Sequence, residues 1–519
     1  MENITRRDFL KKGLVAASLV GLPSISFASS RGAWPHLREW NYEETQKYAR
    51  WIENIQNNKL NGPDKYKGAK INYILKNDEM NLLNDNKFLE NGNSQASNSA
   101  IDSMYSMCDC GRFPMLMFTY YCMRRGLPAV ITANSSKQVR SIPFSGDFNN
   151  FINANEDFCS RSFRTDPKYE KSGSVLVAID RKFLLPGNIG YDVNGHGLLV
   201  GKVEYNGDVR FLDSHPDQSI SYSKKIDSAL DGNIKMNGVV YGGLRNFRLA
   251  KVVNGVAVPM TNEEMKNYGF SLEQTQISGR LSDYVREKLR LEKSKESPLE
   301  YLSKASHDWG EMMRGREEFL QQAWKEVLTN GAINFPNGSS IYNADGRWEV
   351  WSSPSSDCDR KQAYNGMIIR LKQIVEEFPS SSGINYDGFN SRKNLASRLI
   401  EEKEKRFSQE KVAYRHSSGK IVELSLLDVE KRLWNLSFDP NHPPELRWGA
   451  PNGSDERKDM RLIDIPINGI GSLNGLKAYE MEKGLRYFAI RQPGIQYIDS
   501  TNNPKEPPFG TIEETLKNF

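Results

Sequence analysis

Residues 108–121 read CDCGRFPMLMFTYY, and the rest of the chain is best understood from this segment. From Phe113 onward almost every position is apolar, a pattern typical of a helix that is buried on all sides. Pro114 is compatible only with the first turn of a helix, because proline lacks the N–H donor that later turns require. The sequence therefore predicts a buried helix that begins at or just after Cys110.

A cysteine at the start of a helix is a candidate nucleophile. The unpaired N–H groups and the dipole at that end of a helix favour the thiolate, which is the nucleophilic form and needs a base nearby. Cys108 is the rival nucleophile, although it lies two residues further from the helix. We expect Cys122 to be a core residue, whereas Cys159 and Cys358 stay unassigned. Five cysteines are too few, and an odd number, for a disulfide framework.

The candidate base is His196, which stands between two glycines at the head of an alternating apolar segment. Residues 196–203 have the alternation of a half-buried strand. Asn206-Gly207 is a strong hairpin signal, and the return strand carries Asp213. The sequence predicts two antiparallel strands with His196 and Asp213 near the same end.

The register of this hairpin decides whether the two side chains meet. A two-residue turn pairs Asp213 with Val200, and a four-residue loop pairs it with Leu198. Either pairing puts Asp213 and His196 on one face, because side chains alternate with period two. The tighter register leaves them roughly 13 Å apart along the strand. A longer loop or a bulge is therefore required, and Asp217 is the substitute if the tight register holds.

Taken in order, these features resemble a transglutaminase-like domain of the papain-like cysteine clan. The resemblance rests on Cys110 at a helix start, the segment GLPA at 126–129, His196 at a strand head and Asp213 on the next strand. It covers residues 110–250 and implies an α+β fold in which the cysteine-bearing helix packs on a small antiparallel sheet. It also implies a Cys110–His196–Asp213 triad.

The chain departs from that family in two places. Gly197-Leu198 follows the histidine, where the family commonly has an aromatic residue. The interval between Cys110 and His196 is long and rich in Asn, Ser and Phe, which leaves the substrate class open. Cell-wall endopeptidases of the same clan share the order of cysteine and histidine and remain an alternative.

The N-terminus has the features of a targeting signal. Arg6-Arg7 is followed by Phe and Leu, then by a weakly apolar stretch and small residues near Ala28. This resembles a twin-arginine signal peptide spanning residues 1–28, with an ordinary secretory signal as the alternative. We therefore expect a periplasmic or secreted protein that is carried by the twin-arginine export machinery and has no stable membrane span after cleavage.

Near residue 255 the sequence pattern of the remaining chain changes from short β-rich segments to long helical ones. We expect a transglutaminase-like α+β domain with N-terminal helices over 29–255, and a mostly helical region with a small hairpin over 256–519. The helical patterns fall at 281–295, 311–328, 359–378 and 392–407, and the hairpin is expected near 412–426. The sequence assigns no task to this helical half.

The composition and the motifs of the chain argue against several classes of ligand. The 519 residues carry a net charge of +5 that is spread along the chain without a basic block, so we expect no nucleic acid. Cys108 and Cys110 flank a single residue, which is not a metal-ligand spacing. No nucleotide or flavin motif is present, and we expect no cofactor.

These inferences predict an exported, cysteine-dependent amide hydrolase or acyl transferase acting on a cell-envelope peptide or a peptidoglycan-type substrate. Cys110 would attack, His196 would move the proton and Asp213 would orient the imidazole. The alternative is a non-catalytic binding or scaffold protein of the cell envelope that keeps the fold. Hydrolysis against transfer, and the oligomeric state, stay open.

Overall fold

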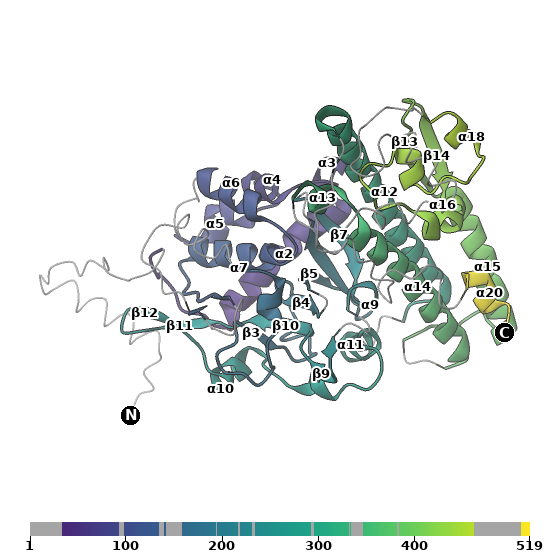
Figure 1. Ribbon diagram of the computed structural model, residues 1–519. Helices are drawn as coiled ribbons and strands as arrows, with labels where there is room; N and C mark the ends of the chain where they lie inside the picture. The colour runs from purple at the N-terminus through teal and green to yellow at the C-terminus, as the bar shows by residue number, and fades with distance from the viewer. Residues whose placement is uncertain are drawn as a thin grey trace, which may run out of the picture.

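The chain folds into a mixed α/β body with helices on both sides of a central antiparallel sheet (Figure 1). The expected signal peptide and Asp217 lie outside the described residues. The computed structural model describes residues 34–92, 98–133, 140–141, 158–193, 195–215, 218–230, 234–291, 295–331, 333, 346–380, 383–460 and 510–519.

The central sheet has six strands in the order β3-β10-β4-β5-β6-β7, and every neighbouring pair is antiparallel. The predicted strand that begins at His196 is β5, and it has neighbours on both sides. The strands are β3 (Ser174–Leu176), β10 (Gly243–Phe247), β4 (Ile189–Asp192), β5 (His196–Val203), β6 (Val209–Ser214) and β7 (Ile220–Lys225).

One face of the sheet is covered by α7 (Arg112–Arg125) and α2 (Tyr42–Asn61). From Phe113 to its end every residue of α7 is buried, as the apolar sequence predicts. Phe118 of α7 stacks on Phe247 of β10 with ring centroids 4.4 Å apart. The fold thus contains the expected buried helix packed on an antiparallel sheet.

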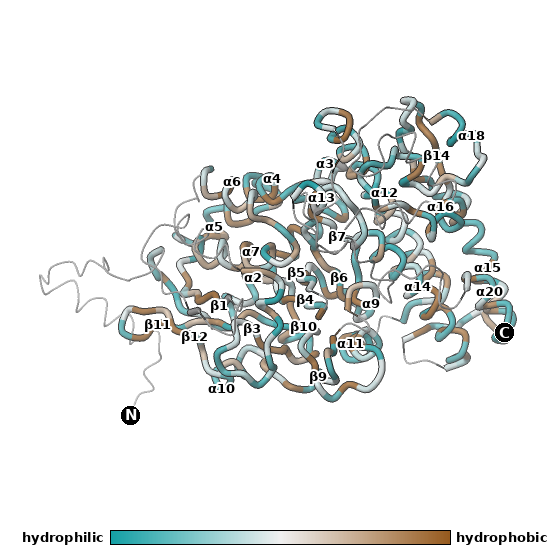
Figure 2. Tube along the Cα trace, viewed as in Figure 1, coloured by the Kyte–Doolittle hydropathy of each residue, from teal (hydrophilic) through white to brown (hydrophobic). Residues whose placement is uncertain are grey.

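The opposite face of the sheet packs on α9 (Ile226–Ala229) and α11 (Leu281–Leu289). Leu198 and Val200 of β5 belong to this second core, whereas Leu199 belongs to the core under α7. The alternation along β5 therefore separates two apolar layers. Figure 2 shows hydrophobic stretches along the central strands and hydrophilic ones along outer helices.

The hairpin β5–β6 differs from the predicted tight turn. Val203 pairs with Val209, so five residues form the loop in place of the expected two-residue turn at Asn206-Gly207. A register shift follows at Gly201, after which Leu199 pairs with Leu212. Beyond the bulge, each residue of β5 pairs with the residue of β6 one position earlier than it would without the bulge. Asp213 is therefore opposite Leu198 and lies on the same face of the sheet as His196.

The second half of the chain is built on its own apolar core. The predicted helices at 311–328 and 392–407 lie within two long helices, the one predicted at 359–378 corresponds to a third that ends at Glu376, and the predicted hairpin is present. The predicted helix at 281–295 is α11, which ends at Leu289. The elements are α12 (Pro298–Asn330), α14 (Pro354–Glu376), α15 (Arg392–Gln409), β13 (Lys411–Arg415), β14 (Ile421–Ser425) and α16 (Leu426–Arg432).

Residue 255, where the texture of the sequence changes, lies in the turn between β11 (Ala250–Val253) and β12 (Val256–Pro259). The α11 helix further along the chain still packs in the core of the sheet. The helices of the second core begin with α12.

Buried ion pairs join the two halves. Arg210 of β6 makes two hydrogen bonds, 2.8 and 3.0 Å long, to Asp308 of α12. Lys225 of β7 lies 2.6 Å from the same carboxylate. Burial of both partners makes these pairs costly to break. They hold α12 against the edge of the sheet.

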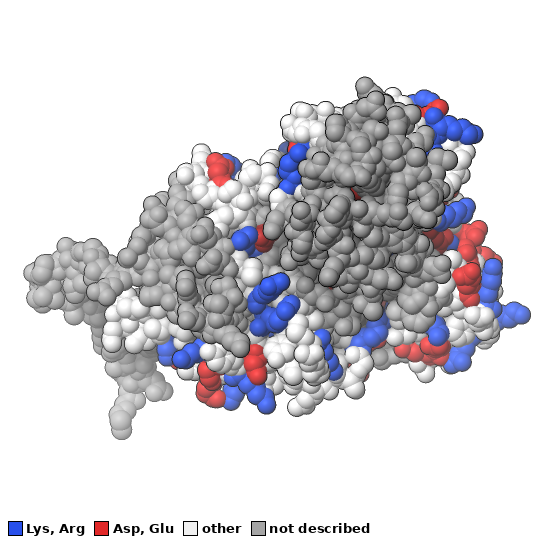
Figure 3. Space-filling view, viewed as in Figure 1, with Lys and Arg blue, Asp and Glu red and all other residues white. Residues whose placement is uncertain are grey.

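The outer surface mixes charges of both signs, and Lys, Arg, Asp and Glu side chains alternate on the face drawn in Figure 3. Among the described helices none combines the length and apolar character needed to cross a membrane.

Candidate active site

Cys110 lies immediately before α7, where the sequence predicts it. Gly111 caps the helix, and the side chain of Asp109 accepts a hydrogen bond of 2.7 Å from the backbone N–H of Arg112. The Asp109 carboxylate also pairs with the Arg112 guanidinium. The thiol of Cys110 is half-buried. The helix start therefore already holds one anion beside the cysteine.

Two glycines let the cysteine loop approach the sheet. A Cβ atom on Gly197 would lie 3.0 Å from the backbone oxygen of Cys110, and one on Gly111 would lie 2.3 Å from the backbone nitrogen of Ser160. A bulky residue after His196 has no room here. The close approach therefore favours glycine at position 197.

His196 and Asp213 are in direct contact. Nε2 of His196 lies 3.0 Å from the Asp213 carboxylate, which is fully buried, whereas the His196 side chain is 24% exposed. Burial by itself lowers the pKa of His196, but the Asp213 carboxylate outweighs it and holds the pKa well above its usual value. In turn His196 and Lys224 overcome the effect of burial and hold the pKa of Asp213 well below its usual range.

The third member, Cys110, interacts with this pair through charge. An electrostatic interaction with Cys110 contributes to raising the pKa of His196. Among the described contacts there is no hydrogen bond between the two side chains. His196 shares a face of β5 with Leu198, whereas α7 packs on the other face of the sheet. The structure brings His196 and Asp213 into direct contact and links Cys110 to them through its electrostatic interaction with His196.

Two further residues in this cluster are absent from the sequence prediction. Nζ of Lys224 lies 2.5 Å from Asp213, 2.6 Å from Asp359 and 3.2 Å from Nε2 of His196. Lys224 is 3% exposed. Burial opposes its charge, but the two carboxylates raise the pKa of Lys224 above its usual value, so it stays an ammonium. Asp359 comes from α14, 135 residues further along the chain.

His196, Asp213 and Asp359 also have the ligand types of a metal centre, with one ligand atom of each within 4.8 Å of the others. The Lys224 ammonium lies in contact with all three groups. A metal ion at the same place would face this fixed positive charge. The cluster therefore fits an ion network better than a metal site.

The other cysteines differ from Cys110. The Cys108 thiol is 3% exposed and lies 3.2 Å from the Ser214 hydroxyl, on the α7 side of the sheet. Burial raises the pKa of both Cys122 and Cys358. Cys159 is half-buried, and none of the five cysteines forms a disulfide bond. The core position expected for Cys122 is confirmed.

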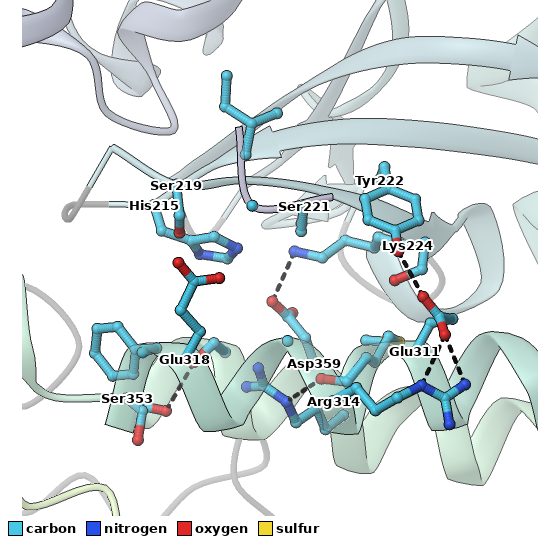
Figure 4. A pocket seen from close by; sticks show the side chains of 18 of the residues that line it. His215, Ser219, Ser221, Tyr222, Lys224, Glu311, Arg314, Glu318, Ser353 and Asp359 are labelled. Carbon is cyan, nitrogen blue, oxygen red and sulfur yellow. Dashed lines mark hydrogen bonds and ion pairs between the residues drawn. The ribbon is translucent and has the colours of Figure 1, made fainter. Parts of the chain in front are cut away.

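A cavity of about 410 Å³ opens beside Lys224, between the edge strand β7 and the helices α12 and α14 (Figure 4). Its walls carry hydroxyl groups, both signs of charge and a few apolar side chains. Cys110 and His196 are not among the residues that line it. The residues labelled in Figure 4 are His215, Ser219, Ser221, Tyr222, Lys224, Glu311, Arg314, Glu318, Ser353 and Asp359.

His215 directly follows the last residue of β6, and its Nε2 lies 4.0 Å from Asp213. It therefore faces both the cavity and the ion network, a position that the sequence does not indicate.

Comparison of the chain with models of protein families, with curated proteins and with solved structures found no significant match.

Proposed function

We propose that this protein is an exported, cysteine-dependent amide hydrolase or acyl transferase with a papain-like, transglutaminase-like core. The observation that carries the proposal is the His196–Asp213 contact of 3.0 Å beside a half-buried cysteine at a helix start. A buried carboxylate that orients a histidine is the arrangement that activates a nucleophile. The charge interaction between Cys110 and His196 supports the same assignment.

In the proposed reaction the Cys110 thiolate attacks the carbonyl carbon of an amide and forms a carbon–sulfur bond. The imidazolium of His196 gives its proton to the leaving nitrogen as the carbon–nitrogen bond breaks. Water or an amine then attacks the thioester carbon, His196 takes up the proton that this nucleophile loses, and the carbon–sulfur bond breaks to release the product and restore the Cys110 thiolate. Asp213 holds the ring, and the backbone N–H of Cys110 is a donor for the developing oxyanion.

The substrate class follows from the twin-arginine-type signal together with the chemistry. An exported enzyme that cleaves amides meets the peptides and the peptidoglycan of the cell envelope. We propose a periplasmic or secreted location on the same basis.

The test is labelling with a small thiol-reactive acyl probe. Cys110→Ala should abolish the label, whereas Cys108→Ala should keep it, because the Cys108 thiol is buried against Ser214. Loss of the label in Cys108→Ala alone would move the nucleophile to that residue. Full labelling in both variants would reject a thiol enzyme at this site.

A second candidate, a binding or scaffold protein of the cell envelope, is favoured by one observation. The cavity of about 410 Å³ lies next to Lys224 and Asp359, but neither Cys110 nor His196 lines it. If the protein is a binder, envelope peptides should bind Cys110→Ala and the parent protein equally and leave both uncleaved. Turnover that disappears in Cys110→Ala would decide for the enzyme.

A further inference from the structure

We propose that Asp359, supplied by the helical half, is a positioning residue of the thiol site: through Lys224 it fixes the orientation and the proton arrangement of the His196–Asp213 pair. This inference rests on the proposed function and gives the helical half a task in it. Asp359 reaches the site by holding the Lys224 ammonium at 2.6 Å.

Two groups compete for Nε2 of His196. Both the Asp213 carboxylate, at 3.0 Å, and the Lys224 ammonium, at 3.2 Å, face this atom. An ammonium only donates hydrogen bonds, and a carboxylate only accepts them. If Nε2 keeps its proton for Asp213, then Nδ1 is free to act as the base. If Nε2 accepts from Lys224, then the proton of the neutral ring moves to Nδ1 and that base is lost.

Asp359 favours Asp213 over Lys224 as the partner of Nε2 of His196. The Lys224 ammonium has two carboxylates at 2.5 and 2.6 Å, which are shorter and stronger contacts than the one to the imidazole. With Asp359 in place, the lysine is drawn toward α14 and leaves Nε2 to Asp213. Without it, the lysine would turn to the two groups that remain, one of which is the histidine ring.

The charges lead to the same conclusion. Asp213 and Asp359 are the two carboxylates of a network whose positive groups are Lys224 and protonated His196; Asp213 and Lys224 are buried, and the Asp359 and His196 side chains are 18% and 24% exposed. Removal of the Asp359 charge takes away one of the negative charges that favour the imidazolium. The imidazolium, which must donate the proton to the leaving group, would be the form that is lost.

The charged and titratable groups around the His196 ring come from both halves of the chain. The cysteine loop supplies Cys110, and β4 places Asp192 opposite His196. Asp213 and His215 come from β6, and Lys224 comes from β7. Of the described residues that contact Lys224 in this network, Asp359 alone comes from the helical half.

The experiment is a pH titration of the His196 ring by NMR in the full chain, with ¹³C-labelled histidine. The chain has six histidines, and the spectrum of His196→Gln assigns the signal. We expect Asp359→Asn to lower the midpoint by about one pH unit and Lys224→Met to raise it by a similar amount. Glu376→Gln, which removes an exposed carboxylate near the other end of α14, is the matched control and should leave it unchanged.

Opposite shifts from two neighbouring residues are a result that simple loosening of the fold does not produce. Asp359→Glu should restore the parent midpoint, because it keeps the charge. Asp359→Ser is the second variant if the asparagine variant does not fold, and the same downward shift is expected. A midpoint in Asp359→Asn and Asp359→Ser equal to that of Glu376→Gln would overturn the inference.

The alkylation rate of Cys110 separates this outcome from failure of the proposed function. If His196→Gln leaves that rate unchanged, the thiol site itself is rejected. If His196→Gln slows it and Asp359→Asn leaves the His196 midpoint in place, only the role of Asp359 is rejected.

Discussion

The backbone oxygen of Cys110 lies 3.0 Å from the point that a Cβ atom on Gly197 would occupy. Here the cysteine loop packs against strand β5, one residue from His196. The distance between the Cys110 thiol and the His196 imidazole therefore depends on Gly197, which has no side chain that could take part in the reaction.

Gly197→Ala tests that dependence. The added methyl group should push the Cys110 loop away from β5 and slow acyl-probe labelling at least tenfold. We expect a much smaller effect on thermal stability, because the required shift is a few tenths of an ångström. Gly315→Ala in α12, where an added Cβ meets nothing within 4 Å, is the control and should not slow labelling. Labelling of Gly197→Ala at the parent rate would contradict the account.

The bulge at Gly201 should be equally intolerant, for a different reason. A Cβ atom there would lie 2.2 Å from the side-chain oxygen of Gln56, which is buried in α2. Gly201→Ala should therefore lower the free energy of unfolding by about 2 kcal/mol and weaken labelling. Denaturant unfolding measures the first effect. An unchanged stability would show that the Gln56 side chain moves aside for the added methyl group and that the close packing at Gly201 is not required.

The contact between the halves can be tested at Asp308. Its carboxylate is shared by Arg210 and Lys225, and all three are largely buried. Asp308→Asn should cost about 3 kcal/mol, because it leaves two buried cations short of a partner. Asp102→Asn, which breaks an exposed pair with Lys76, should change little. Equal effects from the two substitutions in urea unfolding would show that the halves do not depend on this network.

The pH dependence of stability gives a test of His196. Its pKa is raised in the folded protein, so its pairing with Asp213 stabilises the fold fully below the unfolded value. That contribution is lost as the pH rises through the raised, folded value. His196→Gln should therefore destabilise the protein more at pH 6 than at pH 9, as measured by denaturant unfolding. A cost that is larger at pH 9 would show that the histidine is neutral in the fold.

Much of the α/β half could be predicted because its signals are local. Pro114 marks the start of a helix. The alternation of side chains along a strand puts His196 and Asp213 on one face in any register that pairs Asp213 with an even-numbered residue of β5. The loop length could not be predicted. The five-residue loop by itself would put Asp213 and His196 on opposite faces of the sheet, and only the bulge returns them to the same face. Gly201, inside an otherwise alternating strand, is the signal that points to such a bulge.

The ion network could not be predicted in the same way. Lys224 and Asp359 are 135 residues apart, and neither stands in a pattern that suggests a site. Their meeting depends on how α14 docks against the edge of the sheet, which is a property of tertiary packing. The cavity lined by β7, α12 and α14 has the same origin.

The most direct test of the central claim is the rate at which each of the five cysteines reacts with iodoacetamide at pH 6, mapped by mass spectrometry. Cys159, which is also half-buried and free, is the internal reference. We predict that Cys110 reacts at least ten times faster than Cys159, and that His196→Gln removes the difference. Equal rates for the two thiols, unchanged in His196→Gln, would contradict a thiol site built on Cys110, His196 and Asp213.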